Sequence, residues 1–325
     1  MSVLLEVRDL DAVYHTPEGP VRAVDGVDLT VGRGEVLGIV GESGSGKTTL
    51  AMSLMRLIKP PGRILGGSVM LDGEDLFRLR RSQMPARRGR DLALIPQSAM
   101  HALNPVIPVD RQVAEAITAH QTGRKANRKS ALHAARERLE EVGIPPERHR
   151  AYPHELSGGM RQRCVVAMAV ANRPKLIIAD EPVSGLDVVV QARILRLIST
   201  LRESHGLSMI LVSHDLPTVA RVCDRIAVMY AGRIVEVGGS GAVFENPLHP
   251  YTRALVEAIP RMHSPGQTPQ PIPGDPPDLH DLPSGCNFRP RCPRAFSDCA
   301  EVDPSLEEVE PGRRAACLLH KDERR

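Results

Sequence analysis

The 325-residue chain contains no tryptophan and few other aromatic residues, with four tyrosines and four phenylalanines. Proteins that stack the bases of single-stranded nucleic acid need aromatic side chains, so this scarcity argues against such a platform. The charge balance agrees, because 42 Lys and Arg residues and 39 Asp and Glu residues leave a net charge of only +3. Nucleic-acid-binding domains carry a clear basic excess. We therefore expect no nucleic-acid partner.

Long apolar segments are also missing. The longest unbroken run, Cys164 to Ala171, is far shorter than the roughly 18 to 20 residues that a membrane-spanning helix needs. Glu6, Arg8 and Asp9 come too early in the chain for a secretory signal. These absences predict a protein of the cytoplasm that reaches a membrane only through other chains.

Six cysteines fall into two groups. Cys164 and Cys223 stand alone among apolar residues, as small core side chains do. The other four crowd into the last forty residues, at Cys286, Cys292, Cys299 and Cys317. In a reducing cytosol such a group indicates a metal site before it indicates disulfides.

Short apolar segments with strand character alternate with segments of helical spacing. The strand-like segments are residues 35–40, 91–95, 176–179 and 209–212, and residues 156–172 have the pattern of one helix. This alternation predicts an α/β fold whose parallel sheet is covered on both faces. Ligands of such sheets bind at the carboxyl ends of the strands.

The segment from Gly41 to Thr48 matches the pattern G-x-x-x-x-G-K-[ST], directly after a predicted strand and at the start of a predicted helix. Its glycines allow backbone N–H groups to surround phosphates, Lys47 can reach the β and γ phosphates, and the Thr48 hydroxyl can ligate Mg²⁺. We predict an ATP-binding loop formed by Gly41, Ser43, Gly44, Ser45, Gly46, Lys47, Thr48 and Thr49.

Two acidic residues, Asp180 and Glu181, follow the predicted strand 176–179. At this place Asp180 can hold Mg²⁺ through water, and Glu181 can orient or deprotonate the attacking water. Ser157, Gly158 and Gly159 open the predicted helix 156–172 and form a second N-terminus able to bind an anion. A plain helix cap is the simpler alternative for that serine.

Together, the phosphate loop and the Ser-Gly-Gly helix resemble the ATP-binding cassette (ABC) ATPases. The resemblance implies a P-loop NTPase of the ABC type, with a parallel sheet core, an antiparallel β region and a helical subdomain at about residues 98–172. It also implies that Ser157, Gly158 and Gly159 contact the γ-phosphate bound to a second ATPase subunit, so that the working unit is a dimer.

Other motifs of that family follow in order. By resemblance, Tyr14 stacks on adenine, Gln97 senses Mg²⁺ and couples to membrane subunits, and the loop ending at Asp187 touches the other ATPase subunit. His214 contacts the γ-phosphate and holds Glu181 in line. An active ATP hydrolase is therefore implied, with Glu181, His214 and Lys47 as catalytic residues and Thr48, Gln97 and Asp180 at the Mg²⁺ ion.

Three further segments resemble the ATP-binding subunits of oligopeptide/dipeptide permeases: residues 103–105, residues 246–255 and the cysteine-rich tail. The resemblance implies an ATPase at the cytoplasmic face of the membrane that drives import of di- or oligopeptides. Its partners would be two transmembrane permease subunits, a second ATP-binding subunit and an extracytoplasmic substrate-binding protein. Pro96, residues 98–101 and Val189 depart from the usual family residues, which leaves the cargo and the partners open.

Composition changes near residue 261, where a proline-rich segment begins. We expect an ABC nucleotide-binding domain over 1–260, and a linker followed by a small Cys-rich module over 261–325. The four tail cysteines could hold a [4Fe–4S] cluster, a zinc ion or no metal. Structural zinc sites favour closely spaced cysteine pairs, which are absent here, and the resemblance implies an iron–sulfur cluster.

Two alternatives remain. Nickel, oligosaccharide and glycoside importers use related ATPases, so the same mechanism could serve another cargo. A soluble ABC ATPase of DNA repair or translation would carry two cassettes or a long coiled-coil insertion, and this chain has neither.

Overall fold

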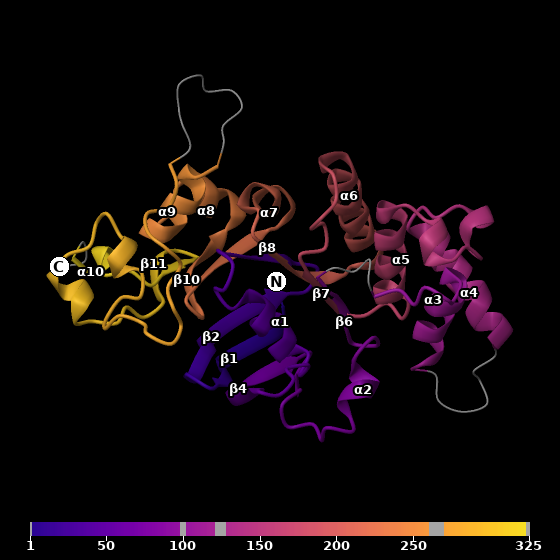
Figure 1. Cartoon of the computed structure of the whole chain (residues 1–325), viewed down its shortest axis with the longest axis horizontal. Helices are drawn as coiled ribbons and strands as arrows, with labels where there is room; N and C mark the ends of the chain where they lie inside the picture. Colours follow the sequence, from indigo (N-terminus) through magenta and orange to yellow (C-terminus); the bar gives the residue numbers. More distant parts are fainter. Residues whose placement is uncertain (1, 98–101, 121–127, 260–269, 323–325) are drawn as a thin grey trace. The chain divides into compact units, whose positions relative to one another are not determined.

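The computed structural model describes residues 2–97, 102–120, 128–259 and 270–322 (Figure 1). The chain forms two compact units. Unit 1 comprises residues 1–2, 32–35 and 78–210, and unit 2 comprises residues 3–31, 36–77 and 211–325. Within the described residues, no helix is both long and apolar enough to cross a membrane.

Unit 2 contains an antiparallel sheet with strand order β2-β1-β4-β5, formed by β1 (Val3–Thr16), β2 (Gly19–Gly32), β4 (Gly62–Leu71) and β5 (Glu74–Asp75). Alternation of side chains along β1 buries Leu5 and Val7 on one face, as the period of a strand requires. Leu5 pairs with Leu71 of β4. This sheet is the antiparallel β region that the sequence predicts.

A second set of strands in unit 2 carries the phosphate loop. The fully buried strand β3 (Val36–Val40) pairs in parallel with β9 (Arg225–Tyr230), and β10 (Arg233–Gly239) continues antiparallel to β9. Helix α1 (Lys47–Leu54) follows the loop, and α7 (Leu216–Val222) packs against β3. Helices α8 (Ser240–Glu245) and α9 (Pro250–Glu257) come after β10.

The cysteine-rich tail belongs to the same unit. Strand β12 (Arg313–Ala315) pairs antiparallel with β10, and β11 (Glu307–Glu310) pairs with β12. Two 3-10 turns (Arg289–Arg291 and Ser297–Ala300) precede these strands, and α10 (Leu319–Asp322) follows them. The tail therefore extends the β9–β10 strands, and the predicted division near residue 261 stays a prediction.

In unit 1, β6 (Leu92–Ile95) pairs in parallel with β7 (Leu176–Asp180). Helices α3 (Val109–Thr118), α4 (Arg128–Glu141) and α5 (Gly158–Val170) pack against one another (Figure 1) and form the predicted helical region. The short α2 (Met84–Arg87) precedes β6, and α6 (Val188–His205) precedes β8 (Ser208–Ser213). The four predicted apolar strands are thus β3, β6, β7 and β8.

Candidate active site

The phosphate loop joins β3 to α1 and wraps around the ammonium group of Lys47. Lys47 is 6% exposed, and its Nζ donates hydrogen bonds to the carbonyl oxygens of Gly41 (2.8 Å) and Glu42 (2.7 Å). Gly46 takes a left-handed conformation with φ of 103°, and a Cβ there would lie 2.1 Å from the Ala23 carbonyl oxygen. Only glycine fits this close approach, which allows α1 to begin directly beneath the loop.

The rest of the loop is open to a ligand. Ser43 and Gly44 are exposed, as is Thr48, while Ser45 is buried and Thr49 half-buried. The helix N-terminus and the ammonium group together form a positively polarised cradle, which suits the phosphates of a nucleotide.

Unit 1 brings two predicted site residues into contact. Asp180 ends β7 and is fully buried, and Glu181 follows it. The Gln97 side-chain amide donates a 3.3 Å hydrogen bond to the Glu181 carboxylate. Glu181 also adopts a φ of 47°, a conformation that costs energy for any residue except glycine and that often marks functional sites.

The Ser-Gly-Gly segment begins α5, as predicted. The Ser157 hydroxyl accepts a 3.3 Å hydrogen bond from the backbone N–H of Met160, so this serine is a helix cap, the simpler role considered for it. A Cβ on Gly159 would come within 2.8 Å of Val190 Cγ1 in α6. The bare backbone of Gly159, next to Gly158, is therefore required for α5 to approach α6 this closely.

Asp187 caps α6 by accepting a 2.9 Å hydrogen bond from the backbone N–H of Val190. The loop before it, which was predicted to touch a second ATPase, exposes Ser184 and Gly185. Directly after the cap, Val188 is 80% exposed and Val189 60% exposed. These two valines leave apolar surface open to water at the start of α6, and the predicted contact of this loop with a second ATPase stays a prediction.

Two further predicted residues lie in unit 2. His214 follows β8 and is exposed. Tyr14 is half-buried in β1 opposite Gly62, where a Cβ would come within 2.6 Å of its ring. The sequence predicts that residues of the two units act together on ATP, and this stays a prediction. Those residues are Lys47, Thr48, Tyr14 and His214 in unit 2 and Asp180, Glu181 and Gln97 in unit 1.

Sequence reasoning missed a clamp on the phosphate loop. The Tyr251 hydroxyl accepts a 2.8 Å hydrogen bond from the backbone N–H of Glu42. The Arg291 guanidinium donates to both carboxylate oxygens of Glu42, at 2.7 and 3.0 Å. Glu42 occupies an unspecified position of the loop pattern, so the motif itself gives no signal for these contacts.

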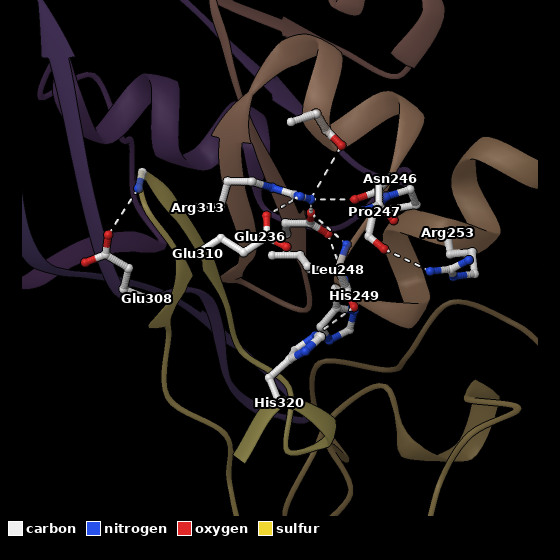
Figure 2. Close-up of polar contacts among 12 residues, drawn as sticks. Glu236, Asn246, Pro247, Leu248, His249, Arg253, Glu308, Glu310, Arg313 and His320 are labelled. Atoms are coloured by element: carbon white, nitrogen blue, oxygen red, sulfur yellow. Dashed lines mark hydrogen bonds and ion pairs between the residues drawn. The ribbon is translucent and has the colours of Figure 1, made fainter. Parts of the chain in front are cut away.

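The segment 246–255, noted in the sequence only as a mark of resemblance, contains Tyr251. Figure 2 shows the polar contacts of the residues just before it, Asn246 to His249. The fully buried Glu236 accepts hydrogen bonds from the backbone N–H groups of Leu248 (3.0 Å) and His249 (2.8 Å). Arg313 of the tail lies 3.4 Å from the same carboxylate and donates to the Asn246 carbonyl oxygen at 2.5 Å. This buried network therefore holds the start of α9 in place.

His249 supplies the cap of that helix. Its Nδ1 accepts a 3.0 Å hydrogen bond from the backbone N–H of Tyr251. Burial, and to a smaller extent the nearby His320, lower the pKa of His249 to about 3. The ring is thus neutral at physiological pH, which keeps Nδ1 available as an acceptor.

Of the six cysteines, Cys164 and Cys223 are buried, as predicted. The four in the tail are free thiols, and the backbone N–H of Cys286 donates to the Cys299 carbonyl oxygen at 2.9 Å. Burial, and to a smaller extent neighbouring tail cysteines, raise the pKa of Cys292 and Cys286, and that of Cys317 to about 11. Across residues 2–97, 102–120, 128–259 and 270–322, however, no three His, Cys, Asp or Glu side chains are grouped to hold a metal ion.

Two family models match the chain. Residues 24–184 match the ABC transporter model, and residues 235–299 match the model described as oligopeptide/dipeptide transporter, C-terminal region. The second match begins in β10 and includes the segment around Tyr251 and three of the four tail cysteines.

Similar proteins are known over nearly the whole length. The oligopeptide transport ATP-binding protein OppD of Escherichia coli (strain K12) is 44% identical over 324 residues, which cover 99% of this chain and 95% of OppD. The dipeptide transport ATP-binding protein DppD of the same strain is 42% identical over 322 residues, 98% of each chain. Among solved structures, the dimeric bacterial ABC transporter cassette MJ0796 is 26% identical with a TM-score of 0.65, covering 73% of this chain and 99% of that one.

Proposed function

Since the chain belongs to the family of ATP-binding proteins of oligopeptide/dipeptide ABC transporters, we propose that it powers the import of di- or oligopeptides. Its ATPase activity follows from membership of the ABC family. The observation that supports the peptide cargo is the length of the similarity, which runs through the cassette and into the tail. The anchoring of α9 by Glu236 and Arg313 gives that C-terminal region a structural role.

The phosphate loop and the residues after β7 divide the work on ATP. Lys47 and the N-terminus of α1 bind the phosphates, and Glu181 acts as the general base toward the attacking water. Mg²⁺, when bound, neutralises charge on the phosphates, and the oxygen donors assigned to it (Thr48, Gln97 and Asp180) are of the type it prefers. Tyr14 stacks on adenine, and His214 contacts the γ-phosphate.

Transport requires partners in this proposal. Ser157, Gly158 and Gly159 act on the ATP of a second ATPase subunit, and Gln97 couples to two transmembrane permease subunits. The contact of Gln97 with Glu181 supports that coupling, because a shift of one side chain would reach the other. A substrate-binding protein delivers the peptide, and the ATPase lies at the cytoplasmic face of the membrane.

We further propose that the four tail cysteines hold a [4Fe–4S] cluster, with zinc as the alternative. The support is the family resemblance of the tail and the place of three of these cysteines within the second family match, although in the described part of the chain their side chains are not grouped around a metal. Purified protein should contain iron and acid-labile sulfide, and Cys286→Ser should lose both, with Cys223→Ser as a buried control. Unchanged iron in Cys286→Ser removes that ligand, and zinc without sulfide selects the alternative.

The transport proposal is tested by purifying tagged Glu181→Gln with ATP in mild detergent and identifying the bound proteins. Two permease-type membrane proteins and a second ATPase are expected. Uptake of labelled peptides by cells lacking the chain should also fall, while nickel and glycoside uptake stays unchanged. Recovery of only soluble partners would overturn the transport role and leave the ATPase activity standing.

A further inference from the structure

The Glu42 carboxylate presents an electrostatic problem for the phosphate loop. Glu42 follows Gly41 directly and precedes the exposed Ser43 and Gly44, in a loop that binds a highly anionic triphosphate. Like charges at short range repel, and the repulsion grows where water is excluded. An unpaired carboxylate at this position would therefore oppose the nucleotide that the loop binds.

Arg291, from the 3-10 turn between Cys286 and Cys292, pairs with that carboxylate. Both terminal guanidinium nitrogens donate to Glu42, at 2.7 and 3.0 Å, in the parallel two-bond geometry that is strongest for this pair. The Arg291 side chain is only 5% exposed, and that of Glu42 is 22% exposed. The Arg291 Nε donates a further 2.7 Å hydrogen bond to the Pro273 carbonyl oxygen, which fixes the direction of the guanidinium plane.

Aromatic rings surround the pair. The Arg291 guanidinium carbon lies 5.9 Å from the centre of the Tyr230 ring and 6.0 Å from that of Phe288. Tyr251 packs 4.6 Å from Tyr230 and 5.3 Å from Phe288, measured between ring centres. The chain has eight tyrosine and phenylalanine residues in all, and three of them lie here. Such rings attract a cation and exclude water, which strengthens the pairing with Glu42.

The tail also reaches the loop through a second segment. A cavity of about 290 Å³ is lined by loop residues 42–45, by Tyr230 and by residues 276–280, which belong to the proline-rich segment. His280 lies 3.8 Å from the carboxylate of Glu18, in the turn between β1 and β2. Residues after 270 therefore meet the phosphate loop at more than one place.

We propose that Arg291 is a positioning residue of the nucleotide site, which neutralises the Glu42 carboxylate and holds it away from the bound triphosphate. ATP affinity then depends on the cysteine-rich tail being in place. The inference rests on the ATP-binding function stated above.

A charge-removal cycle tests this role with the purified full-length chain and Mg-ATP, by calorimetric titration. Arg291→Met should weaken ATP binding about tenfold or more, because it leaves the carboxylate unpaired. Glu42→Gln should bind ATP at least as tightly as the unchanged chain. The double variant should bind like Glu42→Gln, since no charge remains to be neutralised. Arg294→Met, which removes an exposed arginine from the same tail, is the matched control and should leave affinity unchanged.

Recovery of ATP affinity in the double variant distinguishes a positioning role of Arg291 from a merely structural one. A merely structural Arg291 would leave the double variant as weak as Arg291→Met, and that result overturns the inference. If Arg291→Met does not fold, Arg291→Lys replaces it in both backgrounds, with a smaller loss and the same rescue expected. Failure of the unchanged chain to bind ATP would instead contradict the ATPase function itself.

Discussion

The Tyr251 hydroxyl accepts a 2.8 Å hydrogen bond from the backbone N–H of Glu42 and so joins the first turn of α9 to the phosphate loop. Tyr251 is fully buried, and the contact spans 209 residues of sequence. The loop is therefore supported from α9 before any nucleotide binds.

Removing that hydroxyl should loosen the support. Tyr251→Phe keeps the ring packing and deletes one hydrogen bond, with an expected loss of about 1 kcal/mol in the free energy of unfolding. The melting temperature should fall by roughly 2 to 4 °C, as measured by thermal unfolding without nucleotide. Tyr152→Phe, at a side chain that is 38% exposed, is the control. Equal melting temperatures for Tyr251→Phe and the unchanged chain would show that the contact contributes nothing.

Glu181→Gln should bind ATP and barely hydrolyse it. The amide keeps the shape of the side chain but cannot accept the proton of the attacking water, so we expect a loss of roughly 10²- to 10⁴-fold in phosphate release. Glu203→Gln, an exposed change in α6, should leave turnover intact. Normal turnover in Glu181→Gln would remove this residue from the chemical step.

Gly159→Ala should strain the approach of α5 to α6. The new methyl group would lie 2.8 Å from Val190 Cγ1, and a β-branched side chain has little freedom to move aside. Overpacking of this kind costs about 1 to 3 kcal/mol, measurable by urea unfolding alongside ATPase activity. Adding Val190→Ala should restore much of the loss, and the absence of any rescue would place the strain elsewhere.

His249 should make the protein acid-sensitive. Its pKa is about 3 in the folded chain, against an ordinary value of 6.5. Below about pH 6.5 the unfolded chain therefore binds a proton at this residue, whereas the folded chain does not. The free energy of unfolding should fall as the pH drops through this window, by up to about 1.4 kcal/mol per pH unit.

His249→Asn separates this contribution from that of other groups. Asparagine can still accept the capping hydrogen bond but does not titrate, so its stability should fall less steeply between about pH 6.5 and pH 4. Urea unfolding at several pH values measures both slopes. His133→Asn, at a side chain that is 81% exposed, should keep the original slope, and an unchanged slope in His249→Asn would contradict the assignment.

The local sequence pattern predicted the structure correctly where a motif can function only in one structural setting. The glycine-rich loop requires a strand before it and a helix after it, and β3 and α1 are there. Apolar residues 176–179 predicted β7, which ends at Asp180, with Glu181 directly after it. The start of α5 was predicted as well, because Ser157 is a favoured cap.

Long-range contacts had no local signal. Arg291 and Glu42 are 249 residues apart in sequence, and neither lies in a pattern that names the other. Proline content indicated an extended segment after residue 261, but composition alone cannot show that β12 pairs with β10. The buried position of Glu236 could not be predicted from the sequence either. An acidic residue within a strand is usually solvent-exposed rather than a buried acceptor of backbone N–H groups.

Because the chain has no tryptophan, its tyrosine fluorescence can report on the place where the tail meets the phosphate loop. Tyr14, Tyr152, Tyr230 and Tyr251 are the chain's four tyrosines, so its intrinsic ultraviolet emission comes from phenol rings with no indole to mask them. Two of these rings, those of Tyr230 and Tyr251, lie 4.6 Å apart beside Phe288. Displacement of the tail would take Phe288 away from both rings and Arg291 away from Tyr230, and an unlabelled sample would report the event by its own fluorescence.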